Sequence, residues 1–322
     1  MKAVSLWPLP QRENMKGNGL KLVLIILLLP VGLFGQNKYI PPDPYTQWDG
    51  VTHWSRYQIT SAGFLGPNAL PVPLIHKAII PEKFYWSGLY EYYYGTGDET
   101  HDFKTHLIVP IAKGRIGLEF MYVPVEFFSM DSSVSHIRRT ISGNAVNGNA
   151  FGDIYFGTIV QVLKNHPFLP DFSVSMTCRT ASGTGREYAR HTDTPGYYFD
   201  ASIGDSYGKD RGFFRHVRWY AELGFYSWQT YLDNYPQNDA LLFGVGIDFD
   251  FKDFFVNQSL SGYSGYMNNG DEPVVYRIDL GIKTGNAALV FGYERGFRDY
   301  PFQSIRAGFQ ITGLTNRETV VD

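Results

Sequence analysis

The chain has 322 residues, of which 16% are aromatic, with 34 glycines, one cysteine and a formal net charge of −3. This composition fits one large all-β domain and is too polar for a bundle of membrane-spanning helices. The single cysteine, Cys178, excludes an intrachain disulfide framework and a cysteine-rich metal site, and the acidic balance makes nucleic acid an unsuitable partner.

Residues 1–35 are typical of a secretory leader. Their apolar run, Leu22–Phe34, follows two lysines and contains a proline, which suits a signal peptide better than a membrane span. Cleavage near Gly35 would leave 24 basic and 30 acidic residues, a formal charge of about −6. The start codon is either Met1 or Met15, because a charged leader also begins at the second methionine.

Residues 36–83 form a separate segment without sustained alternation, and its seven prolines forbid a regular strand ladder. Its centre, Gly66–Pro73, reads GPNALPVP and has few backbone donors. We expect this segment to act as a plug that narrows the lumen of a barrel formed by the strands that follow. The alternative is a disordered or periplasm-facing leader to the first strand. The expected plug residues are Gly66, Pro67, Asn68, Leu70, Pro71 and Pro73.

From residue 84 onward, apolar and polar residues alternate with a period of two, as in β-strands. The clearest example is Leu241–Phe251, in which apolar residues alternate with glycine or aspartate. The pattern predicts twelve strands, at 84–95, 102–113, 115–128, 151–163, 171–181, 197–207, 217–228, 241–251, 254–266, 274–283, 287–297 and 304–312.

These strands indicate a transmembrane antiparallel β-barrel over residues 84–313, followed by a C-terminal tail at 314–322. Each strand has a charged face and a broad aromatic face that no helix covers, which matches a polar lumen and a lipid surface. The even count suits a bacterial single-chain barrel, although ten or fourteen strands remain open. Short connections at 113–114, 252–253 and 284–286 predict the periplasmic rim, where both termini are expected.

The Gly-Gln leader end, the GPNALPVP segment and the series of aromatic strands resemble outer-membrane β-barrel proteins of the Bacteroidota. The resemblance covers most of the chain, and its sharpest motif is Gly66–Pro73. It implies an outer-membrane location in a Gram-negative bacterium. It brings no assigned catalytic or ligand-binding residues with it.

The alternation predicts a lumen of mixed charge. Because an isolated ion in a partly dehydrated lumen is costly, we expect the arginines to pair with carboxylates. Such a network either lines a solute pathway or only fills and rigidifies a narrow barrel. The predicted lumen-facing residues are Glu91, Lys104, His106, Glu119, Asp153, Arg179, Asp200, Arg218, Glu222, Asp248, Asp250, Arg277, Asp279, Lys283, Glu294 and Arg306.

A few positions do not fit this alternation. Glu126, Asp205 and Arg295 are predicted to point outward near strand ends, where a charge costs little. Pro110 and Pro124 are interpreted as β-bulges, because a closed barrel has no free edge on which to place a proline.

The sequence disfavours several kinds of chemistry. Ser133 and His136 have the crude spacing of a hydrolytic pair but lie in the longest predicted loop, at 129–150. His191 is expected to be solvated in the loop at 182–196. The acidic run that includes Asp98 and Asp102 lacks the spacing of a calcium loop. We therefore predict a non-enzyme with no catalytic residues, metal or cofactor.

The leading hypothesis is an outer-membrane barrel that passes or binds a small solute through a charged, partly plugged lumen. Its partners would be the outer-membrane lipid and that solute. The alternatives are a structural or assembly component of an outer-membrane machine and, third, an outer-membrane hydrolase. The sequence identifies no protein partner.

Overall fold

The computed structural model describes residues 39–208 and 212–313. The predicted leader and C-terminal tail lie outside the described residues. Two short α-helices are present, α2 (Pro44–Gln47) and α3 (Ser132–Ile137). Short 3-10 turns occupy η1 (Trp54–Arg56), η2 (Ala62–Phe64), η3 (Ala112–Gly114) and η4 (Arg186–Tyr188). The strands are β1 (Tyr85–Gly95), β2 (Asp98–Ile111), β3 (Ile116–Met130), β4 (Val146–Ala150), β5 (Tyr155–Leu163), β6 (Asp171–Arg179), β7 (Gly196–Gly208), β8 (Phe214–Leu232), β9 (Tyr235–Phe251), β10 (Phe254–Gly265), β11 (Val274–Thr284), β12 (Ala287–Arg298) and β13 (Phe302–Thr312).

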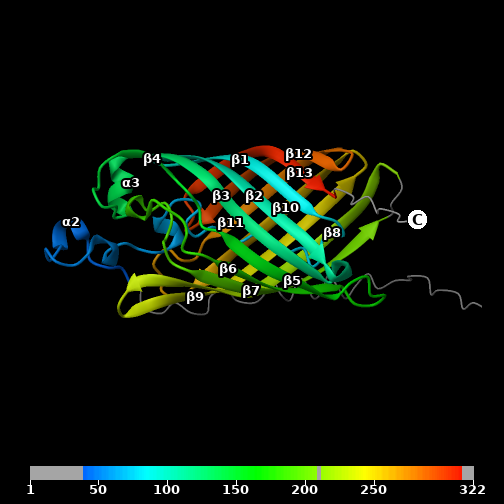
Figure 1. Ribbon diagram of the computed structural model, residues 1–322, viewed down its shortest axis with the longest axis horizontal. Helices are drawn as coiled ribbons and strands as arrows, with labels where there is room; N and C mark the ends of the chain where they lie inside the picture. Colours follow the sequence, from blue (N-terminus) through cyan, green and yellow to red (C-terminus); the bar gives the residue numbers. More distant parts are fainter. Residues whose placement is uncertain (1–38, 209–211, 314–322) are drawn as a thin grey trace, which may run out of the picture. The chain divides into compact units, whose positions relative to one another are not determined.

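The strands form one antiparallel sheet in the order β2-β1-β13-β12-β11-β10-β9-β8-β7-β6-β5-β3-β4, and β2 also pairs with β3, which closes the barrel (Figure 1). β4 and β5 pair with successive parts of β3, so they are two halves of one barrel strand. The predicted twelve-stranded antiparallel barrel is therefore confirmed. No helix among the described residues is long and apolar enough to cross a membrane.

The outer surface of the barrel is apolar, as period-two alternation requires. Arg295, one of the expected outward charges, is exposed. Its exposed aromatic side chains include Tyr90, Phe103, Phe156, Phe225, Phe291 and Phe309.

A β-bulge in β3 reverses the predicted alternation. Thr105 pairs with Tyr122 and Phe103 pairs with Val125, so β3 has one residue more than β2 in this stretch. The extra residue lies at the bulge that was predicted for Pro124. This proline has no N–H to contribute to the ladder. As a result Glu126 is fully buried in the lumen, and its predicted outward orientation was wrong.

Other boundaries also differ from the prediction. Pro110 pairs with Gly117 in an unshifted register, so the bulge expected there is absent. The residues between the predicted strands at 217–228 and 241–251 instead extend β8 and β9 into a hairpin. The predicted strand at 151–163 starts earlier, in β4, and is interrupted at 151–154, where Asp153 lies.

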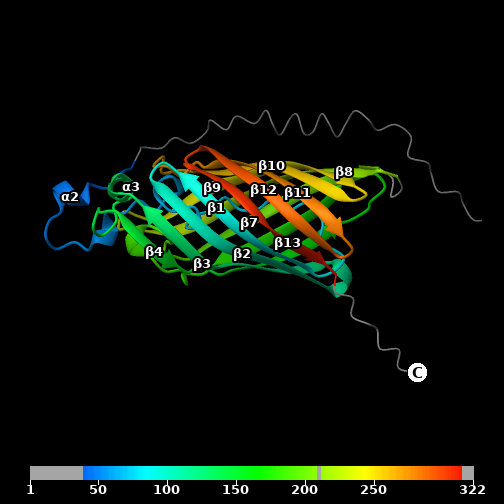
Figure 2. The same cartoon turned by 90° about the horizontal axis from the view of Figure 1, so that it is seen from above.

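We call the two rims of the barrel the loop end and the turn end. The loop end carries α3 and the long connections at 131–145 and 180–195, and the turn end carries the short turns at 252–253 and 285–286. Figure 2, turned by 90° from Figure 1, shows α2 and α3 at the same rim.

The N-terminal segment runs from the loop end to the turn end. At the loop end the Tyr39 backbone N–H donates to Met267 O at 3.3 Å. At the turn end the Ile80 N–H donates to Gln161 Oε1 at 2.9 Å, and Gly313 N donates to Phe84 O at 2.7 Å. The described chain thus begins at the loop end, and the two termini, which were expected at the turn end, lie outside the described residues. This segment passes through the barrel before β1 begins.

Candidate functional site

Arginines of the barrel wall hold the backbone of the N-terminal segment. Arg179 of β6 donates to Ala69 O at 2.7 Å, and Arg277 of β11 donates to Val72 O at 2.8 Å. Arg218 of β8 donates to Lys77 O at 2.8 Å. Prolines remove backbone donors but leave carbonyl acceptors, and a guanidinium supplies up to five donors. The wall is therefore complementary to a segment rich in unpaired carbonyls.

Asn68 of the GPNALPVP motif sits between two carboxylates. Its Nδ2 lies 2.6 Å from Asp102 Oδ2 and 2.6 Å from Glu126 Oε2. Neither carboxylate was among the predicted lumen residues: Asp102 was assigned to an acidic run at the start of a strand, and Glu126 to the outer face. Of the other motif residues, the Pro67 carbonyl accepts from Tyr300 Oη at 3.3 Å.

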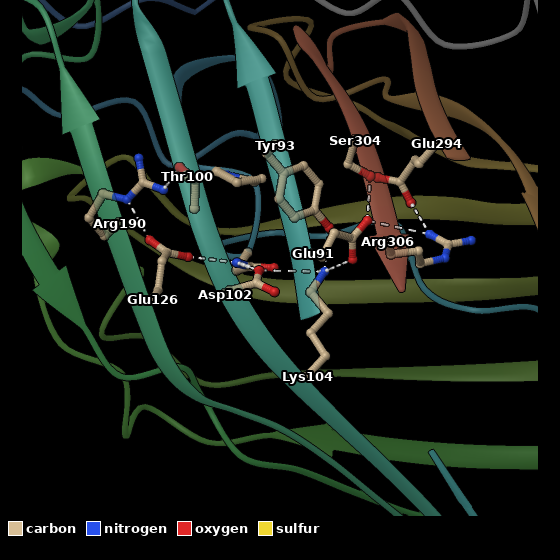
Figure 3. A network of polar contacts seen from close by, with 12 residues as sticks. Glu91, Tyr93, Thr100, Asp102, Lys104, Glu126, Arg190, Glu294, Ser304 and Arg306 are labelled. Atoms are coloured by element: carbon tan, nitrogen blue, oxygen red, sulfur yellow. Dashed lines mark hydrogen bonds and ion pairs between the residues drawn. The ribbon is translucent and has the colours of Figure 1, made fainter. Parts of the chain in front are cut away.

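Ion pairs continue from Asn68 along β1, β2, β12 and β13 (Figure 3). Glu91 lies 3.1 Å from Lys104 Nζ and 3.4 Å from Arg306 Nη1. Arg306 Nε also contacts Asp279 at 2.8 Å, and Arg277 Nε contacts Glu294 at 2.6 Å. Each charge has an opposite partner, which offsets part of the cost of removing it from water.

All the predicted lumen residues are at least half-buried. Asp248 pairs with Lys77 at 2.6 Å, and Asp250 pairs with Lys283. Arg218 pairs with Asp171 at 3.0 Å. Arg179 differs, because within the described residues its hydrogen bonds go to Ala69 and Thr194 and no carboxylate forms an ion pair with it. The expected carboxylate partner of Arg179 was therefore wrong.

Two buried side chains of the loop at 180–195 were missed. Arg190 is 0% exposed, and its guanidinium contacts Glu126 at 2.6 Å and Asp98 at 2.8 Å. His191 is 1% exposed, so its predicted solvation was wrong. The sequence contained one signal for these buried residues. The predicted lumen has more acidic than basic side chains, so cations from outside the strands were needed to pair with the carboxylates.

A second polar cluster surrounds His76 of the segment. Its Nδ1 lies 3.0 Å from Asp200 Oδ2, its Nε2 lies 3.2 Å from Glu119, and its backbone N–H donates to Glu222 at 2.7 Å. His106 Nε2 contacts Glu119 from the other side at 2.8 Å. The ligand atoms of His76, Asp200 and Glu222 lie within 4.8 Å of one another, a donor set that suits a cation. These residues are far apart in sequence, so local spacing did not reveal them.

The rejected hydrolytic pair has no catalytic geometry. Ser133 Oγ donates to Asp131 Oδ1 at 2.7 Å. The His136 ring instead contacts the Tyr45 ring in a tilted arrangement, with ring centroids 4.3 Å apart. Both lie on α3, so the predicted irregular loop contains a helix.

Buried aromatic side chains fill part of the lumen around the segment. Leu70 and Val72 of the segment belong to this cluster. The aromatic members come from β1, β7, β8, β10, β13 and the connection before β13. They are Tyr93, Tyr198, Tyr226, Trp228, Tyr263, Tyr300 and Phe302.

A cavity of about 590 Å³ lies between the segment and the wall. Tyr93, Tyr198 and Tyr300 of the aromatic cluster form part of its lining. At the turn end its lining includes Glu82, whose side chain is 82% exposed, so the cavity reaches solvent there. This volume is within the range of small-molecule sites.

No protein-family model and no curated protein matches the chain. Solved structures do match. An outer-membrane channel from Pseudomonas putida is 10% identical, with a TM-score of 0.50, over 76% of this chain and 97% of that chain. The KdgM porin in complex with disordered oligogalacturonate is 12% identical, with a TM-score of 0.42, over 70% of this chain and 99% of that one. The β domain of the Bordetella autotransporter BrkA is 13% identical, with a TM-score of 0.41, over 72% and 99%. The chain thus has the fold of an outer-membrane β-barrel, in agreement with the predicted fold class and location.

Proposed function

We propose that the chain is an outer-membrane channel for a small solute and that residues 62–76 close its lumen as a plug. The observation that carries the proposal is the cavity, which reaches solvent at the turn end and has aromatic residues packed against the segment in its lining. Twelve strands also lie between the eight that side chains can fill and the sixteen that hold an open pore. The similar Pseudomonas structure is described as an outer-membrane channel, which supports this class of function.

Replacing residues 62–76 with a Gly/Ser linker of equal length tests the plug. The linker preserves the connection to β1 but loses the side chains that pack in the aromatic cluster. We expect a folded, heat-modifiable barrel with raised conductance in planar bilayers. The matched control replaces residues 44–51, which lie at the loop end outside this cluster, and conductance should not change. A folded linker variant with wild-type conductance would remove the plug from the proposal.

A size exchange tests the same point without a large replacement. A Cβ atom on Gly244 would lie 2.6 Å from Ile75 Cδ1, so β9 leaves space there for the segment. We expect Gly244→Leu to displace the segment and raise conductance, and the added change Ile75→Ala to restore the closed state. Gly246→Leu is the control, because its side chain would meet the Tyr220 ring of the wall instead of the segment. Equal conductance in Gly244→Leu and Gly246→Leu would contradict the plug.

The anchor hypothesis has one observation in its favour. Trp48 and Val51 near α2 are 59% and 88% exposed, and Ile137 and Ile141 in the 131–145 connection are 58% and 52% exposed. Exposed apolar side chains outside the strands can contact a partner protein. The anchor hypothesis would be favoured if the linker variant had wild-type conductance and if Trp48→Ala abolished a complex that the wild type forms with another protein.

A further inference from the structure

Residues that line the cavity carry buried polar atoms without hydrogen bonds. Among the described residues, Asp153 Oδ2, Tyr155 Oη and both ring nitrogens of His191 have no hydrogen bond, and His191 Nε2 lies 3.9 Å from the carboxylate of Glu126. All three residues line the cavity, and Asp153 and His191 are 2% and 1% exposed. Buried polar groups in native proteins nearly always have a hydrogen-bond partner, so three such groups on residues that line one cavity point to an occupant.

The position of these groups is fixed by the chain around them. Asp153 Oδ1 accepts from the backbone N–H groups of Ser182 at 3.0 Å and Gly183 at 2.7 Å. These bonds use one carboxylate oxygen and leave the other, Oδ2, without a hydrogen bond. A Cβ atom on Gly183 would contact both Asp153 and the His191 ring, so these two side chains are neighbours. Tyr155 follows Asp153 by two residues and begins β5.

The charges of the lining disfavour an anionic occupant. The guanidinium groups of Arg277 and Arg306 are used by Glu294 and Asp279, and Lys104 is used by Glu91. Among the described lining residues, these cations are therefore not free for an anion. The unpartnered atoms comprise a carboxylate acceptor, a hydroxyl and an imidazole, which together both donate and accept hydrogen bonds.

Aromatic rings complete the chemistry of the cavity. Tyr93, Tyr155, Tyr198 and Tyr300 line it and offer apolar surfaces beside the polar atoms. A ring-shaped polyol presents hydroxyl groups at its edge and C–H groups on its faces. It would match both features of this lining.

We propose that Asp153, Tyr155 and His191 form a binding site for an uncharged, polyhydroxylated solute of monosaccharide size. This inference rests on the proposed channel function and names the substrate class of that channel. Asp153 Oδ2 accepts from a solute hydroxyl, Tyr155 Oη donates to or accepts from a second, and His191 orients a third.

Calorimetric titration of the full chain in detergent micelles with D-glucose tests the site. D-Glucuronate, D-glucosamine and CaCl₂ are titrated in parallel to separate a neutral ligand from an anion or a cation. We expect D-glucose to bind, and Tyr155→Phe and Asp153→Asn each to weaken binding about tenfold, the value of one hydrogen bond. Tyr155→Phe deletes only an unpartnered hydroxyl, so it should fold even if Asp153→Asn does not. Tyr197→Phe on the exposed outer face is the matched control and should bind like the wild type.

Binding of only a charged titrant would overturn the proposal. No heat with any titrant would mean that the cavity holds water alone, which also overturns it. Equal affinity in Tyr155→Phe and Tyr197→Phe would place the sugar elsewhere. The linker variant of residues 62–76, measured in KCl without sugar, reports on the channel separately. Raised conductance without glucose binding would reject this site and retain the channel, whereas glucose binding without raised conductance would retain the site and reject the plug.

Discussion

Removing the guanidinium of Arg190 should strongly destabilise the barrel. This side chain is fully buried, and it contacts Glu126 at 2.6 Å, Asp98 at 2.8 Å and the Thr100 hydroxyl at 2.7 Å. In Arg190→Met the Asp98 carboxylate keeps Arg138 as a partner, so most of the loss falls on Glu126. Breaking one buried ion pair costs about 3–5 kcal/mol, and we expect a value near the lower limit because Asn68 still donates to Glu126.

Urea unfolding in lipid vesicles, followed by tryptophan fluorescence, measures this free energy. The double variant Arg190→Met/Glu126→Gln removes the uncompensated charge and should recover part of the loss, which a double-mutant cycle isolates. Arg295→Met is the control, because Arg295 is exposed on the outer face and its removal should change the unfolding free energy little. A cost for Arg190→Met below about 1 kcal/mol, the range of a surface pair, would refute the buried position of Arg190 and Glu126.

Three further predictions concern orientation, the lipid face and α3. If the loop end is extracellular, a cysteine at Val51 in a Cys178→Ser background should react with an impermeant maleimide on intact cells, and one at position 252 should not; the reverse pattern would invert the barrel. Phe249→Arg on the apolar face should cost about 2–4 kcal/mol in the same unfolding assay if it lies near the membrane midplane, and no cost would place Phe249 outside the membrane. Asp131 caps α3 by accepting a hydrogen bond from the Val134 N–H at 2.8 Å. This hydrogen bond lowers the pKa of Asp131 below its usual 3.8. A carboxyl group whose pKa is lower in the folded state stabilises that state above the unfolded pKa, and this stability is lost as the pH falls through the folded pKa. The rates of proteolysis of the 131–145 connection in the wild type and in Asp131→Ala should therefore differ at pH 7 and converge as the pH falls through the folded pKa.

The strands could be predicted because lipid and lumen impose opposite demands on successive residues. Along β9 the acidic residues Asp248 and Asp250 alternate with apolar ones, and this pattern places both in the lumen. The same logic failed at Glu126, because one extra residue at the Pro124 bulge inverts every later position of β3. A single sequence shows the proline but does not show whether it adds a residue to the ladder or sits in an unshifted register, as Pro110 does.

The loops were less predictable, because polarity does not reveal a loop that folds inward. Arg190 and His191 lie in a stretch of polar residues and glycines that is typical of a solvated connection. Their burial depends on the position of Glu126, which is 64 residues from Arg190 and was itself assigned to the wrong face. The hairpin of β8 and β9 was missed for a related reason: where strands extend beyond the membrane, neither face needs to be apolar and the alternation fades.

The arginines of the lumen connect the plug to the proposed substrate. Arg179 and Arg277 donate to carbonyl groups of the segment, and those carbonyls are in excess because prolines supply no N–H. When the segment leaves the lumen, these donors lose their acceptors, and an unpaired buried donor is costly. An open channel must therefore replace the carbonyls with water or with the oxygens of a passing solute. A polyhydroxylated solute provides such acceptors without adding charge to the wall.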